Sequence, residues 1–469
     1  MRRTKIVATI GPASRAPETL REMVRAGMDV ARLNYSHGTL EEHAETVKRL
    51  RDAAGSAGRP VAILQDLPGP KLRIGPVRDD VVELTPGERL TFICGEEEIT
   101  GDATRMSISW SGLADAVEPG STLYLADGAV RLSVLETRPH DCEVEVEIEV
   151  GGAVASRQGL NIPGPVADLP AVPEEDLHLL EHGESIGVDM VALSFVQSPE
   201  DVETVRAHTR LPLIAKMEKP QAVEHAEAIL RAADCVMIAR GDLGIELPIE
   251  SVPIVQKQLL ERAGWLARPS ITATQMLDSM VHTSRPTRAE VADVANAILD
   301  GTDAVMLSQE TAIGAHPVEA VAMMAAIAVK AESIAPYERW NESRVRRTES
   351  DPAHTIAHNL CDAARELRLD ALVVPTLSGR SARLVSAHRP TVPIYALSPG
   401  RETVRRCGLM WGVQAASIPR HETTEGLIAD AARRVVELGW CKRGQRVGIT
   451  AGLPSGRPGT TSLIQIQNL

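Results

Sequence analysis

The sequence predicts an α/β protein built on an eight-stranded TIM barrel, with an inserted all-β lid domain and a C-terminal α/β domain. Short apolar runs alternate with helix-like stretches, a rhythm that is typical of a parallel sheet. Three such strand–helix units precede a long segment rich in β-like runs, and five follow it. Eight units are the number in a TIM barrel, whose active site lies at the carboxyl ends of the strands.

The first three units form the first part of the barrel, expected over residues 1–69. Each strand is a short apolar run that closes on glycine, proline or a polar residue, as buried strands do. Each helix-like stretch between them ends beside a glycine. The strands are predicted at 5–11, 29–36 and 61–66, and the helices at 17–26 and 39–57.

Residues 70–164 are predicted to form the inserted all-β domain. The segment is rich in short β-like runs and glycine turns. Its stretch CEVEVEIEV, residues 142–150, alternates strictly, as a half-exposed antiparallel strand does. Because the insertion follows the third barrel strand, it leaves from the face that carries the active site, where it can act as a lid.

The strand–helix rhythm returns in residues 165–335, which complete the barrel. Its remaining strands are predicted at 190–195, 213–218, 235–240, 270–275 and 304–308. Polar residues stand at the carboxyl ends of most barrel strands, a distribution that packing does not explain. They are Arg32, Asn34, Ser36, Asp66, Ser194, Lys216, Glu218, Asp242 and Thr274.

The last part of the chain, residues 336–469, is predicted to be a separate α/β domain, joined by a polar linker over 335–351. Its strands are expected at 371–375, 393–397 and 446–450. The loops TLSGRSARL and TAGLPSGRPGTT, which follow two of these strands, each combine small residues, hydroxyls and one or two arginines. Such loops suit a phosphate cradle. They are either a second, regulatory anion site or two ordinary strand-to-helix turns.

Composition excludes several classes of function. A net charge of −13 argues against a nucleic-acid or anionic-membrane binder, and the longest apolar run, 320–329, is too short to span a bilayer. The six cysteines are scattered singly without a CxxC pair, which favours reduced thiols. The first residues contain no signal-peptide apolar region. These features predict a cytoplasmic protein.

The predicted chemistry is centred on IAKMEKP, residues 214–220, and ARGDLG, residues 239–244. Alternate side chains of a strand share a face, so Lys216 and Glu218 point the same way. Glu218 and Asp242, beside a lysine and an arginine, can hold a divalent cation and a phosphate together, because Mg²⁺ prefers carboxylates and shares its coordination with substrate phosphates. The alternative is a set of buried salt bridges that close the strand ends.

Other strand ends offer complementary groups. The RLNYSHG segment begins with Arg32, whose guanidinium can contact a phosphate through two bonds. Asn34 and Ser36 offer neutral oxygens for a weakly held cation, or they belong to a capped helix start. The backbone N–H of Gly241, at a helix start, can bind a substrate carboxylate, and the Thr274 hydroxyl can bond a carboxylate or relay a proton.

The motifs RLNYSHG, QDLPGPKLRIG, LPAVPEED, IAKMEKP, ARGDLG, TATQMLDSM and TLSGRSAR, in this order, resemble those of bacterial pyruvate kinases over nearly the whole chain. The resemblance implies a TIM barrel, a lid inserted after its third strand and a C-terminal effector-binding domain. It also implies transfer of the phosphoryl group of phosphoenolpyruvate to ADP, which gives pyruvate and ATP in the last step of glycolysis. A cytoplasmic homotetramer is expected on the same basis.

Residue roles are implied by position in these motifs. Glu218 and Asp242 correspond to ligands of the essential Mg²⁺, for which Mn²⁺ can substitute, and Lys216 to the group that neutralises the transferring phosphoryl group. The substrate is assigned to Arg32, Lys216, Gly241, Asp242 and Thr274, and the nucleotide to Asn34, His37 and Arg73. A phosphorylated sugar or nucleotide monophosphate effector is assigned to Thr376, Ser378, Gly379, Arg380, Ser381, Arg457 and Gly459.

The chain departs from the family pattern at the end of the last barrel strand. It reads MLSQETAIG over 306–314, where the family usually reads MLSGETAKG. Gln309 therefore replaces a glycine, and Ile313 replaces a lysine that the family associates with the nucleotide. The preferred nucleotide is left open by this change.

A second departure concerns monovalent cations. Lys71 stands where many members carry glutamate, and Leu67 where they carry threonine. Members with that glutamate recruit K⁺ through groups that correspond to Asn34, Ser36 and Asp66. A tethered ammonium can supply the same charge, so the resemblance predicts an enzyme that does not require K⁺.

Two other functions remain open from the sequence. One is a different metal-dependent barrel enzyme that handles phosphoenolpyruvate or pyruvate, such as a lyase, which would not need the inserted lid. The other is a non-catalytic sugar-phosphate sensor that uses only the C-terminal domain. The sensor would have no reason to keep Lys216 and Glu218, and both are present.

Overall fold

The computed structural model describes the chain except for residues 1, 71, 96–97, 164–171, 346–350 and 453–460. Its centre is a closed barrel with the strand order β1-β17-β16-β15-β14-β13-β3-β2, and all neighbouring strands are parallel. The predicted TIM barrel is therefore confirmed. The strands are β1 (Lys5–Thr9), β2 (Val30–Asn34), β3 (Ala62–Asp66), β13 (Met190–Leu193), β14 (Leu213–Met217), β15 (Cys235–Ala239), β16 (Ser270–Ala273) and β17 (Ala304–Leu307).

Helices surround the barrel, and two of the longer ones begin at a capping box. The Thr39 hydroxyl accepts a hydrogen bond from the N–H of Glu42 at the start of α2, and Thr287 does the same for Glu290 at the start of α10. The helices of this layer are α1 (Pro17–Ala26), α2 (Leu40–Ala57), α4 (Glu174–Ile186), α5 (Pro199–Arg206), α6 (Pro220–Glu224), α7 (Ala226–Ala232), α8 (Arg240–Glu246), α9 (Val252–Trp265), α10 (Arg288–Leu299), α11 (Gln309–Ala312) and α12 (Pro317–Glu332).

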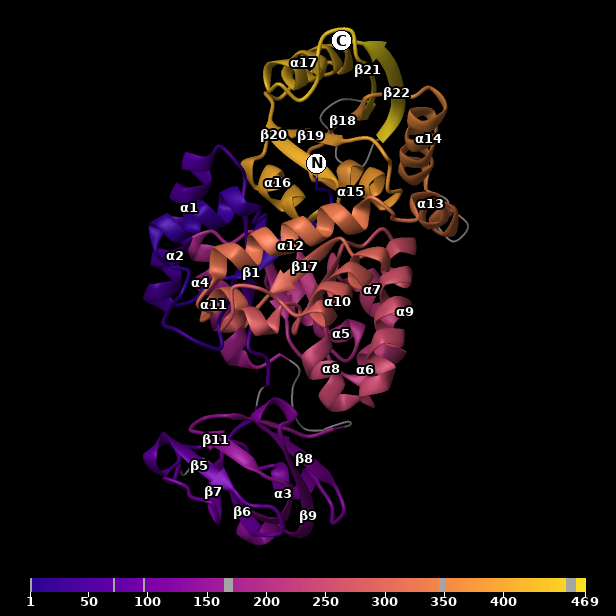
Figure 1. Ribbon diagram of the computed structural model, residues 1–469. Helices are drawn as coiled ribbons and strands as arrows, with labels where there is room; N and C mark the ends of the chain where they lie inside the picture. Colours follow the sequence, from indigo (N-terminus) through magenta and orange to yellow (C-terminus); the bar gives the residue numbers. More distant parts are fainter. Residues whose placement is uncertain (1, 71, 96–97, 164–171, 346–350, 453–460) are drawn as a thin grey trace.

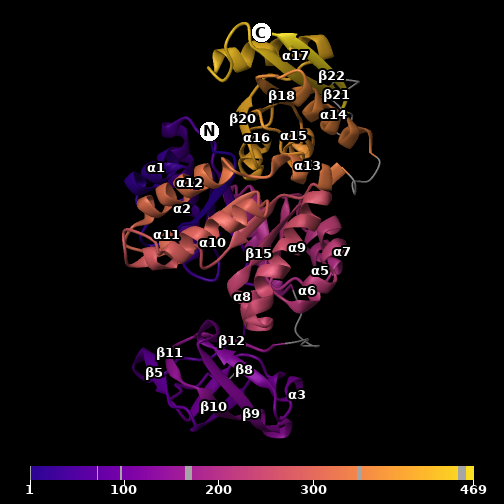
Figure 2. The ribbon, with the colours of Figure 1, turned by 45° about the vertical axis from the view of Figure 1, so that its right-hand side comes forward.

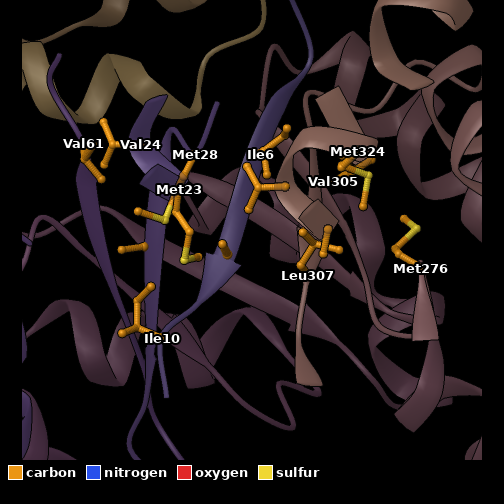
Figure 3. Close-up of a cluster of buried hydrophobic side chains, with 14 of the residues drawn as sticks. Ile6, Ile10, Met23, Val24, Met28, Val61, Met276, Val305, Leu307 and Met324 are labelled. Carbon is orange, nitrogen blue, oxygen red and sulfur yellow. The ribbon is translucent and has the colours of Figure 1, made fainter. Parts of the chain in front are cut away.

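Alternation along each strand divides the apolar core of the barrel into an inner and an outer layer. Outward side chains such as Ile6 and Leu307 pack with helix residues such as Met23, as Figure 3 shows. Inward side chains, among them Val30 and Ile214, form a separate cluster that fills the barrel. The parity of a residue in its strand therefore determines whether it faces the helices or the barrel axis.

The inserted domain is all-β, as predicted, apart from a single short α-helix, α3 (Leu113–Ala116), and short 3₁₀ turns. It combines a sheet in the order β4-β12-β8-β9-β10-β6-β7 with the pair β11-β5, and its own apolar cluster includes Phe92 and Leu132. Its strands are β4 (Leu72–Arg73), β5 (Val81–Leu84), β6 (Arg89–Cys94), β7 (Arg105–Ile108), β8 (Thr122–Leu125), β9 (Val130–Arg138), β10 (Glu143–Val150), β11 (Gly152–Ala155) and β12 (Gly159–Asn161).

The C-terminal domain has a five-stranded sheet in the order β20-β19-β18-β21-β22, in which only β22 is antiparallel to its neighbour. Its strands are β18 (Ala371–Pro375), β19 (Ile394–Ser398), β20 (Val413–Ser417), β21 (Arg446–Gly452) and β22 (Thr461–Asn468). Its helices are α13 (Tyr337–Val345), α14 (Pro352–Glu366), α15 (Arg380–Ala387), α16 (Arg401–Arg406) and α17 (Thr424–Glu437).

The C-terminal domain docks against the amino-terminal ends of the barrel strands. Arg405 bonds Asp189 at 2.6 Å, just before β13, and Arg389 bonds Asp303 at 2.7 Å, just before β17. Leu409 joins the cluster inside the barrel. The β domain is inserted at the opposite, carboxyl-terminal ends, and Figures 1 and 2 show the two domains at opposite ends of the barrel. The β domain is therefore the domain that lies at the carboxyl ends of the barrel strands.

Two expectations from the sequence are corrected, and two strands that it did not name are added. Residues 337–345 of the predicted linker form α13, because Tyr337 and Trp340 pack edge to face and Arg344 is buried. The strands β20 and β22 were not predicted. The barrel strands also end earlier than expected, since β1 ends at Thr9 and β16 at Ala273. The proposed domain boundaries remain predictions.

Candidate active site

A cluster of paired charges lies inside the barrel at the carboxyl ends of the strands. Arg32, Asp66 and Lys216 each follow an inward-facing apolar residue by two positions, so the pleat directs them toward the barrel axis. The Arg32 Nε bonds the Asp66 Oδ2 at 2.6 Å, and its Nη1 bonds the Thr9 Oγ1 at 3.0 Å. The sequence placed Arg32, Asp66 and Lys216 at the carboxyl-end face of the barrel, and in the structure Asp66 bonds both Arg32 and Lys216.

Lys216 is the cation at the centre of this cluster. Its Nζ lies 2.9 Å from the Glu218 Oε1 and 3.3 Å from the Asp66 Oδ1, and it donates to the Ser194 Oγ at 2.7 Å. Burial alone would lower the pKa of Lys216, but the carboxylates around it, including Asp242, raise it above its ordinary value. The surrounding carboxylates therefore favour the charged form of Lys216, whose partners lie at the ends of three different strands.

Glu218 and Asp242 form the carboxylate pair that the sequence assigned to a metal. The Glu218 Oε2 accepts the N–H of Phe195 at 2.7 Å, and Phe195 has a φ of 57°. Burial and the nearby Asp242 carboxylate raise the pKa of Glu218, against the effect of Lys216. The described residues contain no group of three or more metal-ligating side chains.

This donor set fits a magnesium ion that keeps other ligands. Mg²⁺ is commonly held by one or two carboxylates, with waters and substrate oxygens filling its remaining positions. Burial and, after it, the Asp242 carboxylate raise the pKa of Glu218, and a divalent cation between the two carboxylates would stabilise both in their charged form. The residues present therefore fit the ion that the sequence analysis assigned to them.

The loop after β16 and the start of α8 are tied together beside this pair. Thr274 and Gln275 have φ values of 67° and 55°, and Arg240 donates to both of their carbonyl oxygens, at 2.9 and 3.2 Å. The Thr274 Oγ1 accepts the N–H of Gly241 at 2.7 Å and donates to the Ala273 carbonyl at 2.6 Å. The hydroxyl is therefore bonded to backbone rather than to a carboxylate.

A wide cleft separates the barrel from the β domain on the same face. Its volume is about 1020 Å³, and its walls include Ser36, Arg73, Arg157 and Asp176. Arg73 projects from the β domain side and bonds the Arg157 carbonyl at 3.0 Å. Ser36, predicted for the monovalent cation, and Arg73, predicted for the nucleotide, therefore line the same cleft. The cleft is large enough for a nucleotide-sized ligand.

The hinge between the barrel and the β domain has an acidic partner that the sequence analysis did not single out. The Asp176 Oδ2 accepts the N–H of Gly69 at 2.9 Å, and burial raises the pKa of Asp176 to about 6. Gly69 has a φ of 68°, and a Cβ there would lie 2.9 Å from the side chains of Ser194 and Phe195. Only glycine suits this close approach. Asp176 stands in LPAVPEED, so its motif was visible.

Other predicted residues lie in varied surroundings. The Asn34 Oδ1 accepts the N–H of Ser36 at 3.2 Å, and Ser36 lies in the turn after β2 rather than on its face. His37 is exposed, and its carbonyl bonds the His43 ring at 3.0 Å. Ile313 is 60 % exposed. Of these predicted residues, Ser36 lines the cleft.

Two hinge residues were proposed for the monovalent-cation region, and the structure describes one of them, Leu67. Lys71 lies outside the described residues. Leu67 is buried with Val191 and Leu193 in the outer layer of the barrel, because its parity is opposite to that of Asp66. Its side chain therefore does not line a cation position, and the threonine-to-leucine difference is no evidence about the ion.

The predicted effector loop in the C-terminal domain is only partly described, since Arg457 and Gly459 lie outside the described residues. Gly379 has a φ of 87° at the start of α15, and its N–H bonds the Thr376 Oγ1 at 3.0 Å. The Ser381 Oγ lies 2.6 Å from the Thr461 Oγ1. Arg380 pairs with Asp351 at 2.5 Å. Ser378 precedes these residues in the same loop.

Two buried acidic residues near the site were also missed. Glu246 in α8 pairs with Lys219 at 2.5 Å, and Lys219 also reaches the Ile162 carbonyl at 3.3 Å, so this pair connects α8 with the end of the β domain. Glu310 accepts backbone N–H groups from Leu277 and Ser308. Lys219 lies within the IAKMEKP motif, whereas no sequence signal identified its partner.

Comparisons with known proteins agree with this arrangement. The model of the pyruvate kinase barrel domain matches residues 1–321, and that of the pyruvate kinase alpha/beta domain matches residues 354–467. A pyruvate kinase of Bacillus licheniformis is 40% identical over 472 residues, which cover 99% of this chain and 80% of that protein. One from Clostridium acetobutylicum is 37% identical over 473 residues and is covered to 99% of its length.

Proposed function

The chain belongs to the pyruvate kinase family, and from that premise we propose how its own residues perform the reaction. The activity is that of a phosphotransferase acting on phosphoenolpyruvate, ADP and pyruvate. The observation that supports our assignment of the site is the buried Lys216 ammonium, held among Asp66, Glu218 and Asp242 at the carboxyl ends of the barrel strands. The lyase and sensor alternatives are not favoured.

In the proposed mechanism, Lys216 and Arg32 bind the phosphoryl group of phosphoenolpyruvate. Phosphoryl transfer requires positioning and charge neutralisation more than covalent chemistry, and both cations are fixed by Asp66 before substrate arrives. Charges that are preorganised in this way need no reorientation at the transition state. Glu218 and Asp242 would hold the divalent cation, Mg²⁺ or Mn²⁺, which supplies Lewis-acid stabilisation of oxygens when bound.

The Gly241 region would hold the substrate carboxylate. The N–H of Gly241 bonds the Thr274 hydroxyl, so a carboxylate must take this donor from Thr274. The Thr274 hydroxyl would then have to turn its proton away from the Ala273 carbonyl to donate it to the carboxylate or pass it toward the enolate carbon. Arg240, bonded to the Thr274 and Gln275 carbonyls, is a positioning residue for this loop.

The cleft beneath the β domain, whose walls include Ser36 and Arg73, would accept ADP, and we assign Arg73, Asn34 and His37 to the nucleotide. A lactate-dehydrogenase-coupled assay of pyruvate formation, with and without ADP and a divalent cation, tests the whole assignment. Pyruvate should form only when both are present. Formation of pyruvate without ADP would contradict the proposal.

We expect turnover without K⁺. Asp66, which the family relates to the monovalent-cation region, is already paired with two fixed cations here, and we propose that Lys71 supplies the charge that K⁺ brings in other members. In a K⁺-free and Na⁺-free tetramethylammonium buffer, the wild type should keep most of its activity and Lys71→Glu should depend on added K⁺. A wild type that is inactive until K⁺ is added would refute this role of Lys71.

The C-terminal loops would bind a phosphorylated sugar or a nucleotide monophosphate that regulates the enzyme, in a homotetramer that acts in the cytoplasm. The Ser381 hydroxyl and the backbone N–H groups at the start of α15, which follows Gly379, would be donors for a phosphate. Arg457→Ala should abolish activation by such compounds in a steady-state effector screen. The assignment fails if no compound of either class changes the rate of the wild type.

A further inference from the structure

A buried ion pair that takes no part in the proposed chemistry lies between the barrel and the β domain. The Lys219 Nζ bonds the Glu246 Oε1 at 2.5 Å, and the two side chains are only 11 % and 2 % exposed. The Lys219 Nζ also donates to the Ile162 carbonyl of the β domain at 3.3 Å. Burying two charges is costly, and apolar residues of similar volume often stabilise a fold as well or better. Stability alone therefore does not explain the pair.

The pair joins the two segments that carry the proposed metal ligands. Lys219 directly follows Glu218, just after the end of β14. Glu246 is the last residue of α8, four positions after Asp242, and residues at this spacing lie on the same face of a helix. α8 has seven residues and is therefore roughly 10 Å long. A shift at its last residue thus also shifts Asp242.

The β domain contacts the same end of α8 at a second point. Figures 1 and 2 both show α8 on the side of the barrel that faces the β domain. The 3₁₀ turn η2 (Ala126–Gly128) of that domain lies against α8, and a Cβ added at Gly128 would lie 3.3 Å from the Ile245 Cγ1. Ile162 belongs to the apolar cluster of the β domain, so Lys219 holds a residue that is fixed in the interior of that domain.

We propose that Lys219 and Glu246 are positioning residues, and that their ion pair, with its bond to Ile162, is a clamp on the metal site. The clamp limits how far the Glu218 and Asp242 carboxylates can separate, and Mg²⁺ tolerates little deviation from its octahedral geometry. Through Ile162, the clamp also makes this separation depend on the position of the β domain. The inference rests on the proposed function, because it takes Glu218 and Asp242 as the metal ligands.

Single and double substitutions separate positioning from stability. Lys219→Met removes the cation that is bonded to the buried Glu246 carboxylate, so it should lower the unfolding temperature. Lys219→Met/Glu246→Met removes both charges at similar volume and should return the unfolding temperature toward that of the wild type. We expect kcat to stay about tenfold or more below the wild-type value in both variants, because a misplacement of about 1 Å can cost about 10²-fold in rate.

Binding of Mn²⁺, followed by electron paramagnetic resonance, gives a readout that does not require turnover. The double variant should bind Mn²⁺ about tenfold more weakly, the smallest loss that is typical when a residue that orients a metal ligand is removed. Lys257→Met/Asp300→Asn is the matched control, since this pair joins α9 to the end of α10 and does not contact the β domain. The control should keep the wild-type Mn²⁺ affinity and kcat.

Hydrogen exchange measured by mass spectrometry reports the link to the β domain in the unliganded protein. We expect faster exchange in the double variant both in α8 and in residues 159–163, with unchanged exchange in β18 of the C-terminal domain. Ile245→Ala removes only the apolar contact with η2, and this partly buried position should tolerate alanine without unfolding. It should change exchange and Mn²⁺ affinity in the same direction, by less than the double variant does.

The clamp is refuted if the double variant binds Mn²⁺ and turns over as the control does, since the pair would then serve stability alone. It is equally refuted if exchange in residues 159–163 is unchanged in the double variant. If the double variant does not fold, wild-type exchange and Mn²⁺ affinity in Ile245→Ala would reject the clamp. A wild type that forms no pyruvate would instead overturn the proposed function, whereas the Mn²⁺ and exchange measurements would still test the clamp.

Discussion

Replacing Lys216 with methionine should lower the turnover number by at least about 10²-fold, while the barrel stays folded. The Lys216 ammonium lies inside the barrel at the strand ends, within salt-bridge distance of the Asp66 and Glu218 carboxylates. Methionine keeps much of the side-chain volume but removes the charge that would neutralise the transferring group. Because the loss occurs in the transition state, kcat should fall more than the KM for phosphoenolpyruvate rises. Coupled steady-state kinetics measure both.

A control is needed because the substitution also disturbs a buried ion network. Asp66 keeps its bond to Arg32, so we expect a folded protein, which circular dichroism and thermal unfolding can check. Lys257→Met is the matched control, since Lys257 is half exposed and pairs with Asp300 away from the site. A folded Lys216→Met variant with near-normal turnover would show that the ammonium serves only to close the strand ends.

The barrel could be predicted because its signals are local. Short apolar runs between helical stretches place the strands, and parity then directs Arg32, Asp66 and Lys216 to one interior. The strand β20, VQAAS, was missed because it has a single β-branched residue and half-exposed side chains. The polar helix α13 was missed because it owes its stability to packing between domains. Local propensity does not record such tertiary contacts.

The charged centre of the site was predictable, but its hydrogen bonds were not. Motif spacing brings Glu218 and Asp242 together, because β14 and β15 are neighbours in the barrel. The positive φ values of Phe195 and Thr274 are unusual for residues with a Cβ, and no sequence pattern predicts them. In the structure the Phe195 N–H bonds Glu218, and the Thr274 hydroxyl is bonded to backbone. The sequence thus identifies the reacting groups, whereas the backbone determines which of them are free.

Glu218→Gln should weaken binding of the divalent cation. Loss of a residue that only supports a metal ligand costs about 10–100-fold in metal affinity, and we expect a larger loss here because Glu218 is itself a proposed ligand. Glutamine keeps the shape and one oxygen, so the N–H of Phe195 can still be accepted, but a charged ligand for a hard cation is lost. Asp242→Asn should act in the same direction. Lys216 would also lose a counter-charge, which lowers its pKa toward the ordinary value, since Glu218 is one of the groups that raise it.

The measurement should report the metal directly, so that a loss of turnover is not mistaken for a loss of binding. Free Mn²⁺ can be followed by electron paramagnetic resonance during titration of each variant, and the Mg²⁺ dependence of turnover recorded in parallel. Glu332→Gln is a matched control, because Glu332 is buried at the opposite end of the barrel, where its carboxylate accepts the backbone N–H groups of Arg3 and Thr4. If Glu218→Gln binds Mn²⁺ as the control does, Glu218 is a salt-bridge partner of Lys216 and the cation must be held by other groups. If the Mn²⁺ dissociation constant and the Mg²⁺ dependence of turnover both shift in Glu218→Gln and Asp242→Asn but not in Glu332→Gln, the two carboxylates hold the cation together.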